Sequence, residues 1–191
     1  MKARSSMLYA DSGEGKSTQG YFMAKWVWAT FKQRTRWISF DGKYDQLLLP
    51  QRELEGKSLV EAGIVEVHDA VSMKSALADV RRLSEGYWPR EGKNKVTGEL
   101  VKYFQSTAAC ETKDWGDIGL YVIDDLSSLC EAWLVHISDQ NVVGFKPSWI
   151  YAEDDYIYRG VQDAHYGIVQ KELTRIVKQG FNQLPVRYVM Y

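Results

Sequence analysis

The stretch that decides the fold is ADSGEGKST, residues 10–18. It has the spacing of the phosphate-binding pattern G-x-x-x-x-G-K-[ST], except that Ala10 stands in place of the first glycine. A short apolar run over 6–10 leads into it and is interpreted as a buried strand. A helical pattern over 17–34 follows it. This order of strand, glycine-rich turn and helix predicts a loop that cradles phosphate groups.

Each residue type in this stretch has a physical reason. Gly13 and Gly15 let backbone N–H groups turn inward toward phosphate oxygens, a concavity that side chains would block. Lys16 supplies a mobile positive charge for the terminal phosphates, and the Ser17 hydroxyl is placed to ligate Mg²⁺. The helix that follows directs its free N–H groups to the same place. The predicted nucleotide-binding residues are Ser12, Gly13, Glu14, Gly15, Lys16, Ser17 and Thr18.

A second acidic feature lies about a hundred residues further on. The run 120–125, LYVIDD, is four apolar residues followed by two acids, which is typical of a buried strand that ends at a site. Asp124 is predicted to hold Mg²⁺, directly or through water. Asp125 points to the other side of the strand in this interpretation and is the candidate general base for an attacking water. An ordinary solvated strand end is the alternative interpretation of both.

The rest of the chain predicts an α/β fold, a mostly parallel sheet with helices on both faces, in one domain over 1–191. The predicted strands are continuous apolar runs, as in a sheet covered on both sides. Further strands are expected at 37–41, 64–68, 120–124 and 186–191, and further helices at 72–83, 127–138 and 166–181. The stretches 86–117 and 139–165 are expected to be irregular, the first with a short helix inside it at most.

Composition excludes several classes of protein. The chain has 191 residues and a formal net charge of −1, so no global basic field attracts nucleic acid. No apolar run approaches the roughly 18 residues of a membrane span, and no signal peptide is recognised. The two cysteines, Cys110 and Cys130, lack metal-site spacing and cannot form a disulfide framework. We expect a cytoplasmic protein, in the host cytoplasm if it is encoded by a phage.

With these motifs the chain resembles the RecA-like class of P-loop ATPases, and small phage-encoded members in particular. The resemblance rests on the phosphate loop, on 37–45 (WISFDGKYD), on 123–128 (IDDLSS) and on the tail 184–191 (LPVRYVMY). It implies ATP and Mg²⁺ as ligands and hydrolysis of the β–γ phosphate bond, with Lys16 and Asp125 as catalytic residues. It also implies a further strand after Tyr191, so the domain is expected to lack its C-terminal end.

One departure from the family pattern concerns the catalytic base. RecA has a catalytic glutamate just past its second strand, and Lys43 occupies that place here. That role is therefore not carried over, which makes Asp125 the better candidate. Asp41, at the tip of the same strand, is a candidate for indirect contact with Mg²⁺.

The work done with ATP is expected to be DNA recombination, annealing or packaging. Two alternatives stay open: a nucleotide-dependent binding or assembly module with negligible turnover, and a small-molecule kinase. Basic and aromatic residues alternate in 87–104, which makes this loop a candidate surface for single-stranded DNA. A homo-oligomer, ring or filament, is a further expectation, with Arg159, Arg175 and Arg187 as candidates to reach a neighbour's γ-phosphate.

Overall fold

The structure is a computed structural model that describes residues 4–8, 15–70, 80, 82–93, 97–98, 100–104, 115–139, 150–153, 156–159 and 163–191. Its strands are β1 (Arg4–Ser6), β2 (Arg34–Ser39), β3 (Val65–Asp69), β4 (Pro89–Lys93), β5 (Leu100–Phe104), β6 (Ile118–Asp124), β7 (Ile150–Glu153), β8 (Tyr156–Arg159) and β9 (Tyr188–Met190). Its α-helices are α1 (Lys16–Phe31), α4 (Leu126–Asp139) and α5 (Asp163–Arg175). The shorter helices are η1 (Asp45–Leu48), η2 (Arg52–Leu54), the π-helix η3 (Ile176–Gly180) and η4 (Phe181–Gln183).

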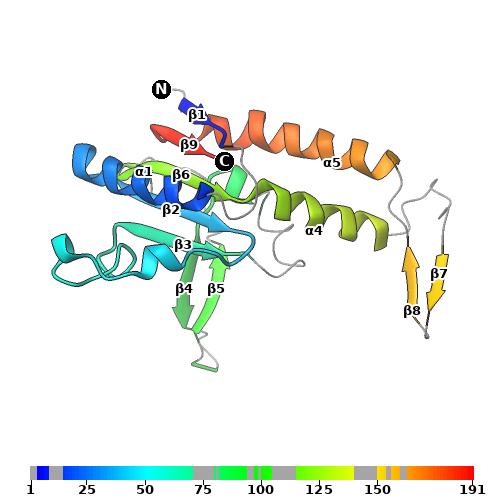
Figure 1. Cartoon of the computed structure of the whole chain (residues 1–191), viewed down its shortest axis with the longest axis horizontal. Coiled ribbons are helices and arrows are strands. Elements are labelled where there is room, and N and C mark those ends of the chain that lie inside the picture. The colour runs from blue at the N-terminus through cyan, green and yellow to red at the C-terminus, as the bar shows by residue number, and fades with distance from the viewer. Residues whose placement is uncertain are drawn as a thin grey trace.

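Five strands form one sheet in the order β1-β9-β6-β2-β3, and every neighbouring pair in it is parallel. The parallel α/β sheet predicted from the apolar runs is therefore confirmed. All seven residues of the central strand β6 are buried, as a strand covered on both faces requires. The sheet brings the two ends of the chain together, because β1 pairs with β9 (Figure 1).

Helices cover both faces of the sheet, and the side chains of β6 alternate between them. The layer under α1 contains Ala24, Val27, Trp37, Leu120 and Val122. The layer under α4 and α5 contains Tyr121, Ile123, Leu129, Trp133 and Val169. Figure 1 shows α1 on one side of the sheet and the long helices α4 and α5 lying together on the other side. Within the residues that the structure describes, no helix is long and apolar enough to cross a membrane.

The junction between α1 and β2 differs from the prediction. The helical pattern was expected to run to Arg34, but α1 ends at Phe31 and Arg34 already begins β2. Lys32 adopts a left-handed conformation with φ of 56°, and its N–H donates to the carbonyl of Trp28 at 3.0 Å. This ending closes the helix. The start of β2 was not predicted because it contains the charged residues Arg34 and Arg36. The acids that pair with them, Glu66 and Asp117, are distant in the sequence.

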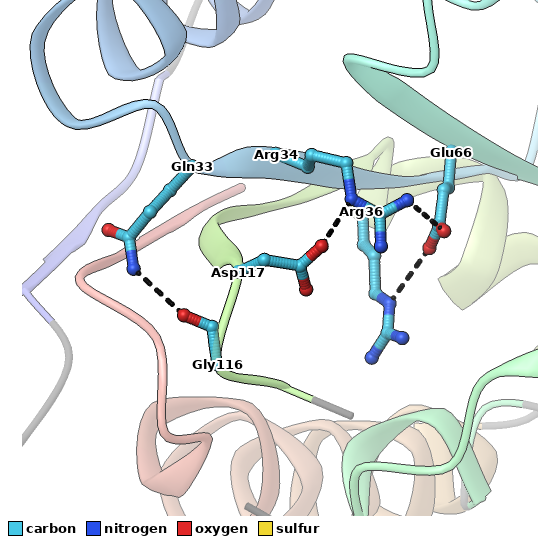
Figure 2. A network of polar contacts seen from close by, with 6 residues as sticks. All are labelled: Gln33, Arg34, Arg36, Glu66, Gly116 and Asp117. Carbon is cyan, nitrogen blue, oxygen red and sulfur yellow. Dashed lines mark hydrogen bonds and ion pairs between the residues drawn. The ribbon is translucent and has the colours of Figure 1, made fainter. Parts of the chain in front are cut away.

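These partners form a network at the amino-terminal end of the sheet (Figure 2). Arg34 donates from Nη1 to Glu66 at 2.5 Å and from Nε to Asp117 at 2.6 Å. Arg36, with only 4% of its surface exposed, donates from Nε to the other Glu66 oxygen at 3.1 Å. Its guanidinium also lies over the ring of Trp115, 4.5 Å from the centroid. Glu66 on β3 thus links two arginines of β2.

The two stretches expected to be irregular each contain an antiparallel hairpin. β4 pairs with β5 and β7 pairs with β8, and neither hairpin belongs to the main sheet (Figure 1). The short helix expected inside 86–117 falls mostly on residues outside the described part, and Trp115, which is described, is helical. The buried strand predicted over 6–10 lies earlier, as β1, whose three residues are exposed, and residues 9–10 are outside the described part. The strand predicted over 186–191 is shorter, as β9, whereas α4 and α5 lie close to their predicted ranges. Most of the helix predicted over 72–83 lies outside the described residues.

Candidate functional site

A cleft lies at the carboxyl ends of the two neighbouring strands β2 and β6. The chain leaves β2 toward β3 on one side, and it leaves β6 toward β9 on the other side. In open parallel sheets, ligands bind in the crevice where neighbouring connections diverge in this way. The cleft is lined by Gly15, Lys16, Ser17, Thr18, Asp41, Lys43, Asp45, Gln46, Asp124 and Asp125. Six of these residues are predicted site residues: Gly15, Lys16, Ser17, Thr18, Asp124 and Asp125.

The amino-terminal end of α1 opens into this cleft. Gly15 precedes the helix with φ of 80°, a left-handed conformation that glycine adopts without steric cost. No side-chain cap is seen at this end among the described residues, and the first turn contains no acidic residue. The positive end of a sixteen-residue helix dipole therefore points into the cleft.

A close contact fixes where α1 lies on the sheet. A Cβ on Gly20 would lie 2.6 Å from a ring carbon of Trp37, and real side chains do not approach so closely. Trp37 is fully buried in β2. The missing side chain at Gly20 therefore lets the first turns of α1 approach the sheet, which places Lys16 and Ser17 above the end of β6.

Asp124 is the buried acid of the cleft, with 8% of its surface exposed. It has the same position in the alternation as Leu120 and Val122, so it lies on the α1 side of the sheet. The Ser17 hydroxyl donates a hydrogen bond to this carboxylate. The Oδ2 atom of Asp124 is buried and has no hydrogen-bond partner. Ser17 and Asp124, each predicted separately as a Mg²⁺ ligand, therefore lie next to each other in the cleft.

The environment of Asp124 disfavours its charge. Burial raises the pKa of Asp124 from 3.8 to about 6, and the neighbouring acids Asp41 and Asp125 add to this rise. The hydrogen bond from Ser17 and the positive charge of Lys16 act in the opposite direction and favour the ionised form. Because burial is the largest of these causes, the ionised form of Asp124 is disfavoured chiefly by its separation from water.

Asp125 caps α4 as well as lining the cleft. Its Oδ1 accepts the backbone N–H of Ser128 at 2.7 Å, three residues on, which is the usual bond of a helix N-cap. The sequence predicted a general base here and did not predict the cap. One carboxylate oxygen is therefore occupied by α4, and the residue remains in the lining of the cleft.

Asp41 follows β2 and lies beside Asp124 in the cleft. The two strand ends are in register, since Ser39 pairs with Asp124 across β2 and β6. Asp41 Oδ1 accepts the backbone N–H of Lys43 at 3.0 Å, and its Oδ2 lies 3.3 Å from Lys43 Nζ. Asp41 is thus held in a turn with its own counter-charge, and Lys43 presents a second cation to the cleft.

The sequence did not single out the wall formed by η1 and η2. Gln46 lines the cleft, and its Oε1 accepts the Thr18 hydroxyl at 3.1 Å. One turn further along α1, Tyr21 donates to Gln51 at 2.7 Å, and Lys25 pairs with Glu53 in the next turn. This wall consists of three- and four-residue helices. Such short elements leave no periodic pattern in a sequence, so no signal marks Gln46 in advance.

Other predicted residues are not brought to the cleft. Ser12, Gly13 and Glu14 lie outside the described residues. Arg175 pairs with Glu172 on α5, and the Arg187 guanidinium lies over Phe31, 4.6 Å from the ring centroid. The side chain of Arg159 is likewise outside the described part of the structure.

The surface predicted for single-stranded DNA over 87–104 is largely the β4–β5 hairpin. Trp88, at its base, packs against the core instead of standing free. Its ring makes edge contacts with His68 and Tyr121 at centroid distances of 6.2 and 5.9 Å, and the Arg36 guanidinium lies 5.1 Å from the centroid. Trp88 therefore anchors the hairpin to the sheet. Lys93, at the end of β4, is exposed.

No group of three His, Cys, Asp or Glu residues suited to a metal ion occurs among the described residues. No protein-family model matches the chain, and no curated protein matches its sequence. The case for a function therefore depends on the geometry of the cleft.

Proposed function

We propose that the protein is a P-loop NTPase of the RecA-like kind, which binds Mg-ATP in the cleft between β2 and β6 and hydrolyses its β–γ bond. The single observation that carries this proposal is the hydrogen bond from Ser17 to Asp124, formed under the uncapped end of α1 and beside Lys16. It joins the two halves of the sequence pattern, which are more than a hundred residues apart.

The phosphates are assigned to the start of α1. The positive end of the α1 dipole and the Lys16 ammonium supply positive potential at this end of the cleft. The Thr18 hydroxyl, now donated to Gln46, is in reach of the same region because both residues line the cleft. We assign the inner phosphates to Thr18 and the loop, and the terminal phosphates to Lys16.

The residues present fit a divalent cation. The Oδ2 atom of Asp124 is buried and has no hydrogen-bond partner. Asp41 and Asp125 are near this carboxylate, so the three acids together would stabilise a cation. Ser17 and Asp124 would hold Mg²⁺, and the phosphates and water would supply the remaining ligands. When bound, the ion neutralises the charge that develops on the phosphate oxygens during transfer.

In hydrolysis, a water oxygen forms a bond to the γ-phosphorus while the bond from that phosphorus to the β–γ bridging oxygen breaks. A carboxylate in the cleft takes the proton of the attacking water. We assign this role to Asp125, whose second oxygen is not needed for the cap of α4. Asp41 is the alternative, since it lies next to Asp124 on the neighbouring strand end.

One observation favours a second candidate function, a nucleotide-dependent binding or assembly module with negligible turnover. Asp125 is committed in part to capping α4, and Lys43 stands where the RecA family has its catalytic glutamate. A cleft with these groups would bind the nucleotide and leave water poorly activated. The kinase alternative finds no specific support in the described residues.

The discriminating experiment is phosphate release from ATP and from GTP, with and without single- and double-stranded DNA. We expect Asp125→Asn to lower kcat by roughly 10²–10⁴-fold with ATP affinity nearly unchanged. Asparagine caps a helix as well as aspartate does, so a lower rate in this variant cannot be assigned to a lost cap.

If Asp125→Asn hydrolyses ATP at the wild-type rate, the same assay on Asp41→Asn decides whether the base lies there. A wild-type protein that binds Mg-ATP and releases no phosphate under any of these conditions is the binding module. Stimulation by DNA would support the proposed work in recombination, annealing or packaging, and the ratio of the two nucleotide rates gives the base preference.

A further inference from the structure

We infer that the outer surface of α1, with the adjoining strands β1 and β9, is a binding surface for single-stranded nucleic acid. This α1–β9 surface consists of Arg4, Phe22, Trp26, Phe31, Arg187 and Tyr188. It differs from the 87–104 stretch to which the sequence pointed, and it does not depend on the hydrolysis proposed above.

The first observation is that α1 exposes large aromatic side chains to solvent. Phe22 is 56% exposed and Trp26 is 45% exposed, and they lie one turn apart on the same side of the helix. A helix that covers a sheet ordinarily has polar residues on its outer side. Exposed aromatic residues on the outer side of α1 therefore indicate a surface that meets a partner.

The second observation is that these rings belong to an organised group. Trp26 makes edge contacts with Phe31 and Tyr188 at centroid distances of 5.4 and 5.6 Å. Phe31 also lies 6.3 Å from Tyr188. Rings held by their neighbours lose little conformational freedom when a flat ligand stacks on them, and this pre-organisation favours affinity.

The third observation is the charge of the surface. The Arg187 guanidinium lies over Phe31, and Arg4 pairs with Tyr188 across β1 and β9. Arg4 and Arg187 are both exposed. Lys32 extends the cationic side with its ammonium over the ring of Trp28, 5.9 Å from the centroid.

No negative charge from these elements opposes the cations. The sequence has no Asp or Glu anywhere in 15–40, in 4–8 or in 186–191. Two acids on adjoining segments already have cationic partners, since Glu53 pairs with Lys25 and Asp117 pairs with Arg34. The surface is thus complementary to a ligand that is continuously negative.

Stacking rings beside unopposed arginines suit single-stranded nucleic acid in particular. Bases present flat faces to the aromatic rings, and the phosphates between them pair with guanidinium groups. Duplex DNA hides its base faces, which would leave Phe22 and Trp26 without a role. An anionic membrane or a second copy of the chain would also cover exposed aromatic residues, and the experiment below separates these occupants.

The surface lies at the other end of α1 from the cleft. Measured along α1 at about 1.5 Å per residue, Phe22, Trp26 and Phe31 lie roughly 9, 15 and 22 Å from Lys16, at which the helix begins. A variant at the α1–β9 surface is therefore expected to leave nucleotide affinity unchanged. Failure of this proposal and failure of the proposed ATPase activity are consequently distinguishable.

The test is fluorescence anisotropy of a labelled thymidine 20-mer with the full chain, over a range of salt concentrations, with and without nucleotide. We expect the double variant Arg4→Gln with Arg187→Gln to weaken binding and to reduce the slope of log K against log salt by about 1.4, roughly 0.7 for each phosphate that is no longer neutralised. We expect Trp26→Ala to weaken binding roughly five- to a hundredfold, and Trp26→Phe to restore most of it.

The matched control carries the same loss of charge elsewhere. Lys171→Gln with Lys178→Gln removes two exposed cations from α5 and η3 and should leave the slope unchanged. If the oligonucleotide does not bind in any condition, or if the control and the test variant lose affinity equally, the proposal is wrong. It is also overturned if Trp26→Ala abolishes self-association in sedimentation or pelleting with anionic vesicles, and leaves oligonucleotide binding intact.

Discussion

Charged side chains are arranged differently at the two ends of the central sheet. At the amino ends of the strands, Arg34 and Arg36 share Glu66, and Asp117 completes the network (Figure 2). At the carboxyl ends, four acids meet two lysines, and Asp124 keeps a buried oxygen without a partner. A charge that finds its partner inside the protein contributes to the fold. Under the proposed function, the buried Asp124 carboxylate is kept for a cation at a cost in stability.

The largest expected effect comes from removing the shared acid of the paired end. Glu66→Gln leaves two arginines without their common anion, and Arg36 is nearly fully buried. We expect a loss of about 2–3 kcal/mol in the free energy of unfolding, because an uncompensated buried charge is costly. Urea unfolding measures it. Titration calorimetry should show unchanged Mg-ATP affinity, and a large loss of affinity would contradict the separation of the two ends.

The same acid-to-amide change at the carboxyl end of the sheet should raise the free energy of unfolding instead of lowering it. Asp124→Asn removes a desolvated carboxylate, so we expect the ligand-free protein to gain about 2 kcal/mol at pH 7.5. Thermal unfolding in a chelator, without nucleotide, measures the gain. Mg²⁺-dependent ATP binding should be damaged in this variant. An Asp124→Asn protein that is less stable than wild type would contradict the inference that the buried carboxylate destabilises the ligand-free protein.

The pKa of Asp124 also predicts how this gain depends on pH. The folded pKa, about 6, lies above the ordinary value of 3.8, so the folded state holds the proton more tightly than the unfolded chain does. The wild-type carboxyl is favourable below pH 3.8, and its contribution is lost as the pH rises through about 6. The stability advantage of Asp124→Asn should therefore be full at about pH 7.5 and absent near pH 4.

A smaller effect is expected from the cation at the start of α1. Lys16→Ala removes a positive charge assigned to the terminal phosphates and should weaken Mg-ATP binding at least tenfold, about 1.4 kcal/mol or more. Titration calorimetry measures this affinity, with Lys171→Ala on α5 as the control for loss of an exposed lysine. Unchanged affinity in Lys16→Ala would mean that the phosphates do not bind at the start of α1.

The smallest effect separates the two roles of Asp125. Asp125→Ala removes the cap of α4 and should cost about 1 kcal/mol of unfolding free energy, whereas Asp125→Asn should cost nearly nothing. Chemical unfolding of the two variants side by side measures the difference. Equal stability of both would show that the bond to Ser128 is not a stabilising cap.

The sequence predicted the sheet where hydrophobic patterning was strong. The strand 120–124 and the helix 127–138 correspond to β6 and α4, because burial on both faces or on one face leaves a clear pattern. Arg34 and Arg36 lie on a strand but look like the end of a helix, since their partners Glu66 and Asp117 are distant in sequence. The β4–β5 and β7–β8 hairpins lie outside the main sheet, and their sequences have no continuous apolar run like that of β6.

The candidate site was predictable where residue type and spacing reflect chemistry. Ser17 and Asp124 meet as expected, because the strand-end acid has the same parity as the buried residues that face α1. Gln46 was not predictable, since its place in the cleft depends on a tertiary contact with Thr18. Nor does the sequence alone say that Trp88 faces inward, because an aromatic residue in a basic stretch suits either a binding surface or an anchor.

The pairing of β1 with β9 has a consequence for biosynthesis. Arg4 and its partner Tyr188 are far apart in the sequence, so Arg4 is made long before Tyr188. At roughly 5–20 residues per second, β1 waits about ten to forty seconds on the ribosome before its strand partner exists. The segment that leads into the proposed phosphate-binding loop therefore has no strand partner in the sheet during this interval. Such sequence-distant contacts also slow folding after release, so early exposure of this end makes it a natural site for chaperone capture.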